Sequence, residues 1–118
     1  MDKNTEISLL FDFYGQLLSV KQHEAVSLYY NDDLSLSETA EVMGITRQGV
    51  RDLVKRSEAE LYEYEQKLGL YKRFEGVTEC AKSIRSLAES AADTDNENIK
   101  SALLNIISLT QKLEQQEE

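Results

Sequence analysis

The chain has 118 residues, which is typical of a single domain, and its 31 Leu, Ile, Val and Phe residues suffice for a hydrophobic core. It contains no Pro and only five Gly, which argues against a sandwich or barrel of short strands and predicts an all-α fold. The net charge of −9 opposes non-specific attraction to nucleic acid or anionic lipid, so either function would need a local basic patch.

Two helices are expected in the first 30 residues. Steps of three and four predict a helix over residues 5–17 that ends near Gly15, with one face made of Ile7, Leu10, Phe11, Tyr14 and Leu17 or Leu18. Ser19 is the expected N-cap of the next helix, because Gln22 follows three residues later. Val20, His23 or Glu24, Ser27, Leu28 and Tyr30 continue the helical pattern, before residues 31–33 break it.

A capping box predicts the start of a third helix. Ser35 and Glu38 have the required S-x-x-E spacing, and this short helix should end at Gly44. Its inward positions are Leu36, Ala40 and Met43. Thr46 is the expected N-cap of a long fourth helix, whose seam comprises Val50, Val54, Ser57, Leu61, Tyr64 and Leu68 at steps of four and three.

Two further helices are predicted beyond Gly69. The first has a seam of Leu70, Phe74, Val77, Ala81, Ile84, Ala88 and Ala91; after a polar connector at residues 93–96, the second has Ile99, Leu103, Ile106, Thr110 and Leu113. Two helices cannot shield that many apolar positions by themselves. They require either an internal bundle core or a homodimer interface, and the sequence favours neither alternative over the other.

The stretch from residue 36 to 55 meets the physical requirements of a helix-turn-helix. Ala40 is the small residue where the two helices cross, Gly44 tolerates the left-handed conformation of the turn, and Ile45 closes the turn. Val50 and Leu53 anchor the second helix from below. The helical repeat then turns a set of polar and basic residues outward at the start of that helix.

This outward set is the predicted DNA-binding site. Arg pairs with guanine, Gln with adenine, and a helix N-terminus with phosphate. Between Thr46 and Arg56, four basic residues and one acidic residue give a local charge of +3, against −12 for the rest of the chain. The predicted residues are Thr46, Arg47, Gln48, Arg51, Asp52, Lys55 and Arg56. The alternative is a helix-turn-helix that serves as a scaffold, with its outer face used for a protein partner.

Other classes of site are not predicted. One Cys and one His cannot provide the four ligands of a structural zinc site, and neither a catalytic constellation nor a Gly-rich phosphate loop is present, so we expect no metal, no cofactor and no enzymatic activity. Cys80 is expected to be a small buried residue, and His23 to face solvent. Because the longest uncharged run is the 11 residues from Ser101 to Gln111, and about 18 are needed to cross a bilayer, we expect no membrane span. Glu6 and Asp12 interrupt the only apolar stretch near the N-terminus that could belong to a signal peptide, so we expect a cytoplasmic protein.

Several strings of the sequence carry a family resemblance. Residues 18–61 resemble the promoter-reading C-terminal domain of sigma factors. More closely, the chain resembles the bacterial YlxM family in LFDFYG (10–15), LSVKQ (18–22), LYYNDDLSL (28–36), TRQGV (46–50) and YEQKLGLY (64–71), a match over residues 7 to about 74. In the resemblance Thr46, Arg47 and Gln48 correspond to the family's entry into the second helix, and Gly49 replaces its usual Ala.

The resemblance implies a small helix-turn-helix regulator linked to the signal recognition particle pathway, because the family's gene lies beside that of the particle's GTPase. We therefore expect residues 1–68 to form a sigma-like DNA-binding module and residues 69–118 to form a helical extension for dimerisation or partner binding. The expected function is regulation through double-stranded DNA. The alternative is an interaction protein that contacts a protein or ribonucleoprotein of the signal recognition particle pathway.

Overall fold

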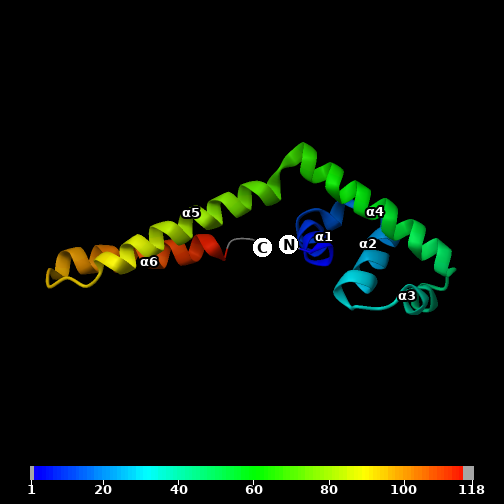
Figure 1. Cartoon of the computed structure of the whole chain (residues 1–118), viewed down its shortest axis with the longest axis horizontal. Coiled ribbons are helices and arrows are strands. Elements are labelled where there is room, and N and C mark those ends of the chain that lie inside the picture. Colours follow the sequence, from blue (N-terminus) through cyan, green and yellow to red (C-terminus); the bar gives the residue numbers. More distant parts are fainter. Residues whose placement is uncertain (1, 116–118) are drawn as a thin grey trace. The chain divides into compact units, whose positions relative to one another are not determined.

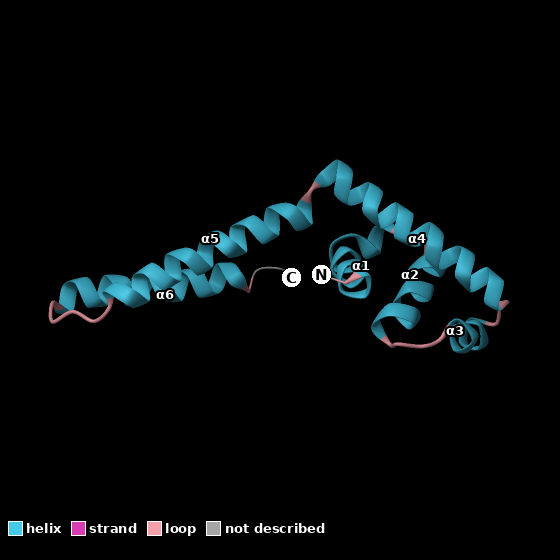
Figure 2. Cartoon of the chain, viewed as in Figure 1, coloured by secondary structure: helices cyan, strands magenta, loops and turns pink. Residues whose placement is uncertain are grey.

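The computed structural model describes residues 2–115, which contain six α-helices and no strand, so the all-α prediction is confirmed (Figures 1 and 2). The helices are α1 (Lys3–Tyr14), α2 (Val20–Val26), α3 (Leu36–Met43), α4 (Arg47–Leu68), α5 (Leu70–Ala91) and α6 (Glu97–Glu114). A 3-10 turn, η1 (Gly15–Leu17), follows α1, and a π-helix, η2 (Ser27–Asn31), follows α2. The chain divides into two compact units, Met1–Tyr71 and Lys72–Glu118. None of the helices described here is both long and apolar enough to cross a bilayer.

Side-chain caps determine where the first helices begin. The Asp2 carboxylate accepts a hydrogen bond of 2.7 Å from the Thr5 N–H and so caps α1. Ser19 and Ser35 both form complete capping boxes, with Gln22 and Glu38 respectively. The two capping boxes predicted from the sequence are therefore confirmed. They could be predicted because a capping box depends on residues only three positions apart.

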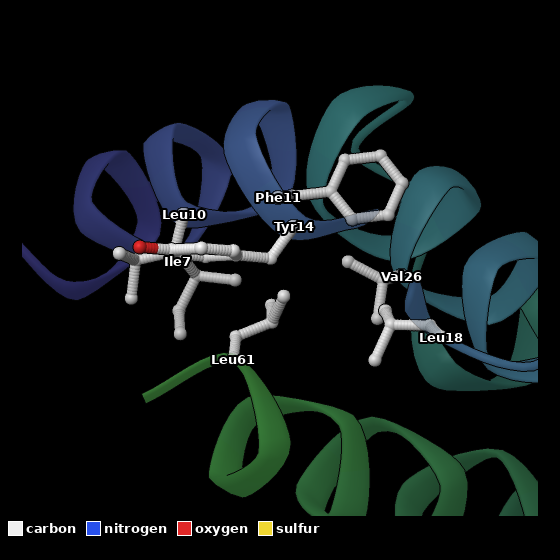
Figure 3. Packing of buried hydrophobic residues seen from close by; sticks show 7 residues of the cluster. All are labelled: Ile7, Leu10, Phe11, Tyr14, Leu18, Val26 and Leu61. Atoms are coloured by element: carbon white, nitrogen blue, oxygen red, sulfur yellow. The ribbon is translucent and has the colours of Figure 1, made fainter. Parts of the chain in front are cut away.

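The hydrophobic core of the first unit has two clusters, and α4 contributes to both. The larger cluster joins α1, α2 and α4 and consists of Ile7, Leu10, Phe11, Tyr14, Leu18, Val26 and Leu61. Figure 3 shows Leu61 of α4 facing the side chains of α1 and Val26 of α2. The smaller cluster consists of Ala25, Ala40, Val50 and Val54, at the meeting of α2, α3 and α4. Leu36, Met43 and Leu53 are partly buried against it, as the sequence predicted for these positions.

The predicted pattern of α2 is wrong at Val20, which is 84% exposed, whereas Gln22, Ala25 and Val26 are buried. Ser27, Leu28 and Tyr30 are half-buried, and His23 is exposed, as expected for a residue facing solvent. The buried residues of α2 keep the α-helical spacing of three and four but lie on another face than Val20, and the π-helix that begins at Ser27 ends this spacing. Gln22 is buried because its amide closes the capping box and also donates a hydrogen bond to Glu60 of α4.

The start of α5 is held by side chains of α1 and α4. Gly69 precedes α5 and has no side chain with which to cap it. Instead, the Leu70 N–H donates to the Tyr14 hydroxyl at 2.9 Å, and the Tyr71 N–H donates to Glu65 Oε1 at 3.0 Å. The Tyr14 hydroxyl in turn donates to Glu65 Oε1 at 2.6 Å. Burial and this hydrogen bond raise the pKa of Tyr14, so the hydroxyl stays protonated at neutral pH.

The prediction that Leu68 belongs to the α4 seam is wrong. Its side chain is 56% exposed, while Val50, Val54, Ser57 and Leu61 are buried and Tyr64 is half-buried, as predicted. The last turn of α4 extends beyond the hydrophobic clusters, both of which end at or before Leu61 along this helix.

The second unit consists of most of α5 together with α6, which lie side by side. Arg85 of α5 forms an ion pair with Glu114 of α6, and an apolar cleft of about 230 Å³ lies between the helices. The buried residues of this pair are small: Ala81, Ala88 and Thr110. Most of the large seam residues remain more than a third exposed, among them Val77, Ile84, Ile99, Ile106 and Leu113. The packing of α5 against α6 therefore covers the two seams only in part.

The prediction that Cys80 is buried is wrong, because its thiol is exposed. Its neighbour Ala81 is buried. Successive positions on an α-helix are rotated by about 100°, and the step from Ala81 to Cys80 is enough to leave the covered face.

Replacing Ala40 by Leu should destabilise the first unit. Ala40 is 7% exposed in the cluster where α3 crosses α4, and the larger side chain would overpack that crossing at a cost of about 1 to 3 kcal/mol. Urea denaturation measures the change in the free energy of unfolding. Val42→Leu is the matched control, since Val42 lies on the same helix at 60% exposure and should tolerate a similar enlargement. Equal stability of the Ala40 variant and the parent would contradict this packing.

Candidate nucleic-acid interface

The turn between α3 and α4 has the geometry of a helix-turn-helix. Gly44 follows α3 with φ 69° and ψ 32°, the left-handed conformation that the sequence predicted for this position. The N–H groups of Gly44 and Ile45 both donate hydrogen bonds to the carbonyl of Ala40, and these bonds end α3 at the turn. Ile45 then packs against the cluster beneath α4. The first turn of α4 is thereby fixed on the core.

Thr46 caps α4, as predicted. Its Oγ1 accepts a hydrogen bond of 3.0 Å from the Gly49 N–H. A Cβ atom at position 49 would lie 3.1 Å from Thr46 Oγ1 and 3.6 Å from Ile45 Cδ1. Gly49 therefore leaves space for the capping hydroxyl, which offsets part of the roughly 1 kcal/mol that glycine costs inside a helix.

The structure brings the predicted site residues together over the first three turns of one helix. Val50 and Val54 are buried beneath this segment. All seven predicted residues are exposed above it: Thr46, Arg47, Gln48, Arg51, Asp52, Lys55 and Arg56. Residues four apart are neighbours on a helix, so Arg47, Arg51 and Lys55 form one row and Gln48, Asp52 and Arg56 form a second.

The cations of this face are not neutralised by other residues of the part of the chain that the structure describes. Among residues 2–115, none of Arg47, Arg51, Lys55 and Arg56 forms an ion pair. Asp52, the one acidic residue between Thr46 and Arg56, instead accepts a hydrogen bond of 3.0 Å from the Gln48 amide. The basic side chains are thus available to an external anion, and Gln48 is held in place by its neighbour.

Three further residues adjoin the basic row, and the sequence analysis did not assign them to the site. Lys3 of α1 and Tyr29 and Tyr30 of η2 line a groove of about 350 Å³ together with Arg51 and Lys55. The tyrosines are half-buried and pack against the smaller hydrophobic cluster. Their position next to the basic row depends on the π-helix and on contacts between residues more than 20 positions apart, for which the sequence pattern contains no signal.

The chain matches a known protein family over most of its length. A family profile described as "Putative helix-turn-helix protein, YlxM / p13 like" matches residues 1–103. The chain belongs to this YlxM/p13-like family. The match includes α1 to α5 and the beginning of α6, and so extends well beyond the predicted limit near residue 74.

Curated relatives of the chain are named UPF0122 proteins. The relative from Bacillus pumilus is 45% identical over 95 residues, which are 80% of this chain and 86% of the relative. The relative from Halalkalibacterium halodurans is 43% identical over 95 residues, with 80% and 87% covered. A Bacillus cereus relative is 38% identical over 114 residues, with 97% of this chain and 99% of the relative covered. The C-terminal helices therefore belong to the family sequence too.

Removal of the capping hydroxyl should loosen the start of α4. In Thr46→Ala the Gly49 N–H loses its acceptor, and the expected loss is about 0.5 to 2 kcal/mol of unfolding free energy in urea denaturation. Thr46→Ser keeps the acceptor oxygen and should remain within about 0.5 kcal/mol of the parent, because Ser caps a helix about as well as Thr. If the alanine and serine variants were equally stable, the cap would not contribute.

Proposed function

We propose that the chain is a cytoplasmic regulator that binds duplex DNA through the N-terminal half of α4. The observation that carries this proposal is the exposed basic face in which Arg47, Arg51 and Lys55 lack ion-pair partners among residues 2–115. Such a helix fits the major groove, where its first residues meet base edges and its later residues meet phosphates.

Each side chain of the face has a role in this proposal. Arg47 and Arg51 donate paired hydrogen bonds to guanine, and Gln48 reads a neighbouring base edge. The N-terminus of α4 holds a backbone phosphate close to Thr46. Lys55 lies one turn beyond Arg51 and contacts phosphate, which adds affinity without selecting a sequence. Membership of a helix-turn-helix family supports this assignment of roles.

The acidic balance of the chain is compatible with this proposal. Charges other than those between Thr46 and Arg56 sum to −12, yet exposed charges are screened beyond about 8 Å at physiological salt. Contacts within the basic face then dominate the binding energy. The remaining acidic surface disfavours binding of DNA in other orientations.

A protein or ribonucleoprotein partner is the second candidate. The net charge of −9 and the exposed apolar residues of α5 and α6 favour it, and the family resemblance would connect such a partner with the signal recognition particle pathway. In this case the helix-turn-helix serves as a scaffold. The first experiment is a selection of bound sequences from a random duplex pool at physiological salt: enrichment of one motif supports DNA reading, whereas no enrichment together with a co-purifying protein supports the second candidate.

The C-terminal helices support a homodimer. Seam residues of α5 and α6 remain exposed on both sides of the apolar cleft, and Leu87 at its edge is 72% exposed. Two helix pairs with seams of this spacing form a four-helix bundle when they pack together, which covers both seams. A dimer would also present two α4 helices to two half-sites of a palindromic duplex.

The DNA proposal predicts different effects for two kinds of variant. Arg47→Ala or Arg51→Ala should cost about 1 to 3 kcal/mol of binding energy and relax specificity at one base pair. Lys55→Ala should weaken binding to all duplexes similarly and reduce the salt slope by about one unit. Fluorescence anisotropy with the selected duplex and a scrambled duplex measures both effects. Arg73→Ala is the matched control, because Arg73 is exposed on α5 outside the basic face. Parent-like binding by all three variants would refute DNA reading by this face.

The dimer proposal predicts the mass in solution. Light scattering should give twice the 13.5 kDa of one chain, and Leu87→Glu should shift the mass towards 13.5 kDa because it places a charge at the edge of the cleft. Val20→Glu changes an equally apolar residue that is 84% exposed on α2, and this control should leave the dimer intact. A mass of 13.5 kDa for the parent at every concentration would mean that the seams close without a second chain.

A further inference from the structure

A groove beside the basic row contains groups that the DNA proposal does not use. It lies among α1, η2, α3 and α4, all within the first unit, and has a volume of about 350 Å³, within the range of small-molecule sites. Lys3, Arg51 and Lys55 provide its cations, and Tyr29 and Tyr30 provide its aromatic surface. Leu36 and Val54 add apolar side chains to the lining. The groove is therefore suited to a ligand with one anionic end and one planar ring.

The charge at the basic end of the groove favours an anion. Glu58 is the acidic residue in the lining, and it pairs with Lys3 at 3.3 Å and accepts a hydrogen bond from the Tyr30 hydroxyl. Burial, followed by this hydrogen bond, raises the pKa of Tyr30 well above its usual value, so Tyr30 remains a donor at neutral pH. Glu58 is thus neutralised by its neighbours, while Arg51 and Lys55 have no ion-pair partner among residues 2–115. Two cations without an ion-pair partner suit a phosphate.

The π-helix provides the aromatic part of the groove. Tyr29 and Tyr30 are consecutive, with ring centroids 5.0 Å apart and planes at 85°. Both line the groove, although consecutive residues on an α-helix would point about 100° apart. A π-helical turn is rare and is found preferentially at functional sites. Tyr29 is half-buried, and its ring provides a surface on which a base can stack.

A second hollow continues the groove past the tyrosines and has a different chemistry. It shares Asn4, Tyr29 and Tyr30 with the first and is lined further by Asp33, Ser35 and Glu38. Glu38 already accepts the Ser35 N–H in the capping box, whereas the Asp33 carboxylate accepts no hydrogen bond from residues 2–115. Carboxylate oxygens accept hydrogen bonds from hydroxyl and amino groups and repel phosphate. The combined groove thus runs from a cationic end, across two aromatic rings, to an acceptor end.

We propose that this groove binds a nucleoside phosphate, with the phosphate on Arg51 and Lys55, the base against Tyr29, and sugar hydroxyls or base amino groups directed to Asp33. The proposal rests on the proposed DNA function in one respect: Arg51 and Lys55 belong to both sites. A nucleotide in the groove therefore competes with duplex DNA for these two cations. Such competition makes the groove a regulatory site, because each ligand weakens binding of the other by the same factor.

The same chemistry has two possible sources, a free nucleotide or an unpaired nucleotide at the end of a bound strand. Calorimetric titration with AMP and GMP tests the free source. Titrations with adenosine and with ribose 5-phosphate test whether both parts of the ligand are needed, and each should bind at least tenfold more weakly than AMP. Blunt duplexes compared with duplexes that have a one-nucleotide overhang test the strand source.

Variants separate the groove from the DNA face. Tyr29→Leu should weaken nucleotide binding at least tenfold and still bind a blunt duplex like the parent, because Tyr29 is outside the basic row. Arg51→Ala should weaken both, and Arg73→Ala, the matched guanidinium control on α5, should change neither by more than twofold. Tyr29→Phe keeps the ring and should retain nucleotide binding. Circular dichroism melting shows whether Tyr29→Leu is folded. If it is not, the test rests on Arg51→Ala, which should weaken nucleotide binding, while Tyr29→Phe and Arg73→Ala should retain it.

The outcomes distinguish the two proposals. Saturable binding of AMP or GMP that Tyr29→Leu abolishes supports the groove as a site for a free nucleotide, even if no duplex binds. A gain in affinity from the overhang that is lost in the same variant supports the strand source. The groove proposal is overturned if neither nucleotide binds and the overhang adds nothing. If blunt duplexes still bind in that case, the DNA function stands alone.

Discussion

The buried seam of α4 is the constraint on which the rest of the first unit depends. Helices α1, α2 and α3 all pack against α4, and Val50, Val54, Ser57 and Leu61 are the buried positions of its seam. A seam buried at four successive positions fixes the rotation of a helix about its own axis. The basic side chains at the start of α4 therefore point away from the core. The packing that stabilises the unit thus also sets the orientation of the basic face.

Acidic and basic residues of α4 have different roles. Glu58, Glu60 and Glu65 accept hydrogen bonds from Tyr30, Gln22 and Tyr14 respectively, so these carboxylates join the earlier helices to α4. The four cations between Thr46 and Arg56 form no such link within residues 2–115. Part of the negative net charge is thus used within the fold, and the positive charge is left at the surface. For this reason the overall charge is a poor guide to the partner of this chain.

The sequence predicts this structure well where the determining interactions are local. The caps at Ser19, Ser35 and Thr46 each depend on residues three positions apart. In the 22-residue helix α4 the apolar pattern repeats many times, so one exposed position does not change the predicted buried face. Predictions fail where a period is short or interrupted, as in the face of α2 beside the π-helix. They also fail for Cys80, which is exposed although its neighbour Ala81 is buried.

The candidate site divides in the same way between predictable and unpredictable parts. Exposure of the residues from Thr46 to Arg56 follows from the repeat of a single helix, so their position could be predicted. The groove joins Lys3, Tyr29 and Arg51, which lie on three different elements and meet only in the folded chain. No spacing rule connects such residues. The sequence pattern does not indicate the π-helix, so it cannot place Tyr29 and Tyr30 beside Arg51.

The hydrogen bonds at the start of α5 affect the order in which the chain acquires structure. Forming the first turn of a helix is the costly step, and each later residue adds to it readily. Here Tyr14 and Glu65 hold the first N–H groups of α5 in place, so the first unit acts as the nucleus for a helix that belongs mostly to the second. Because a ribosome releases the N-terminal part of a chain first, that nucleus precedes most of α5 during synthesis. We therefore expect the first turn of α5 to form more readily once the first unit has folded.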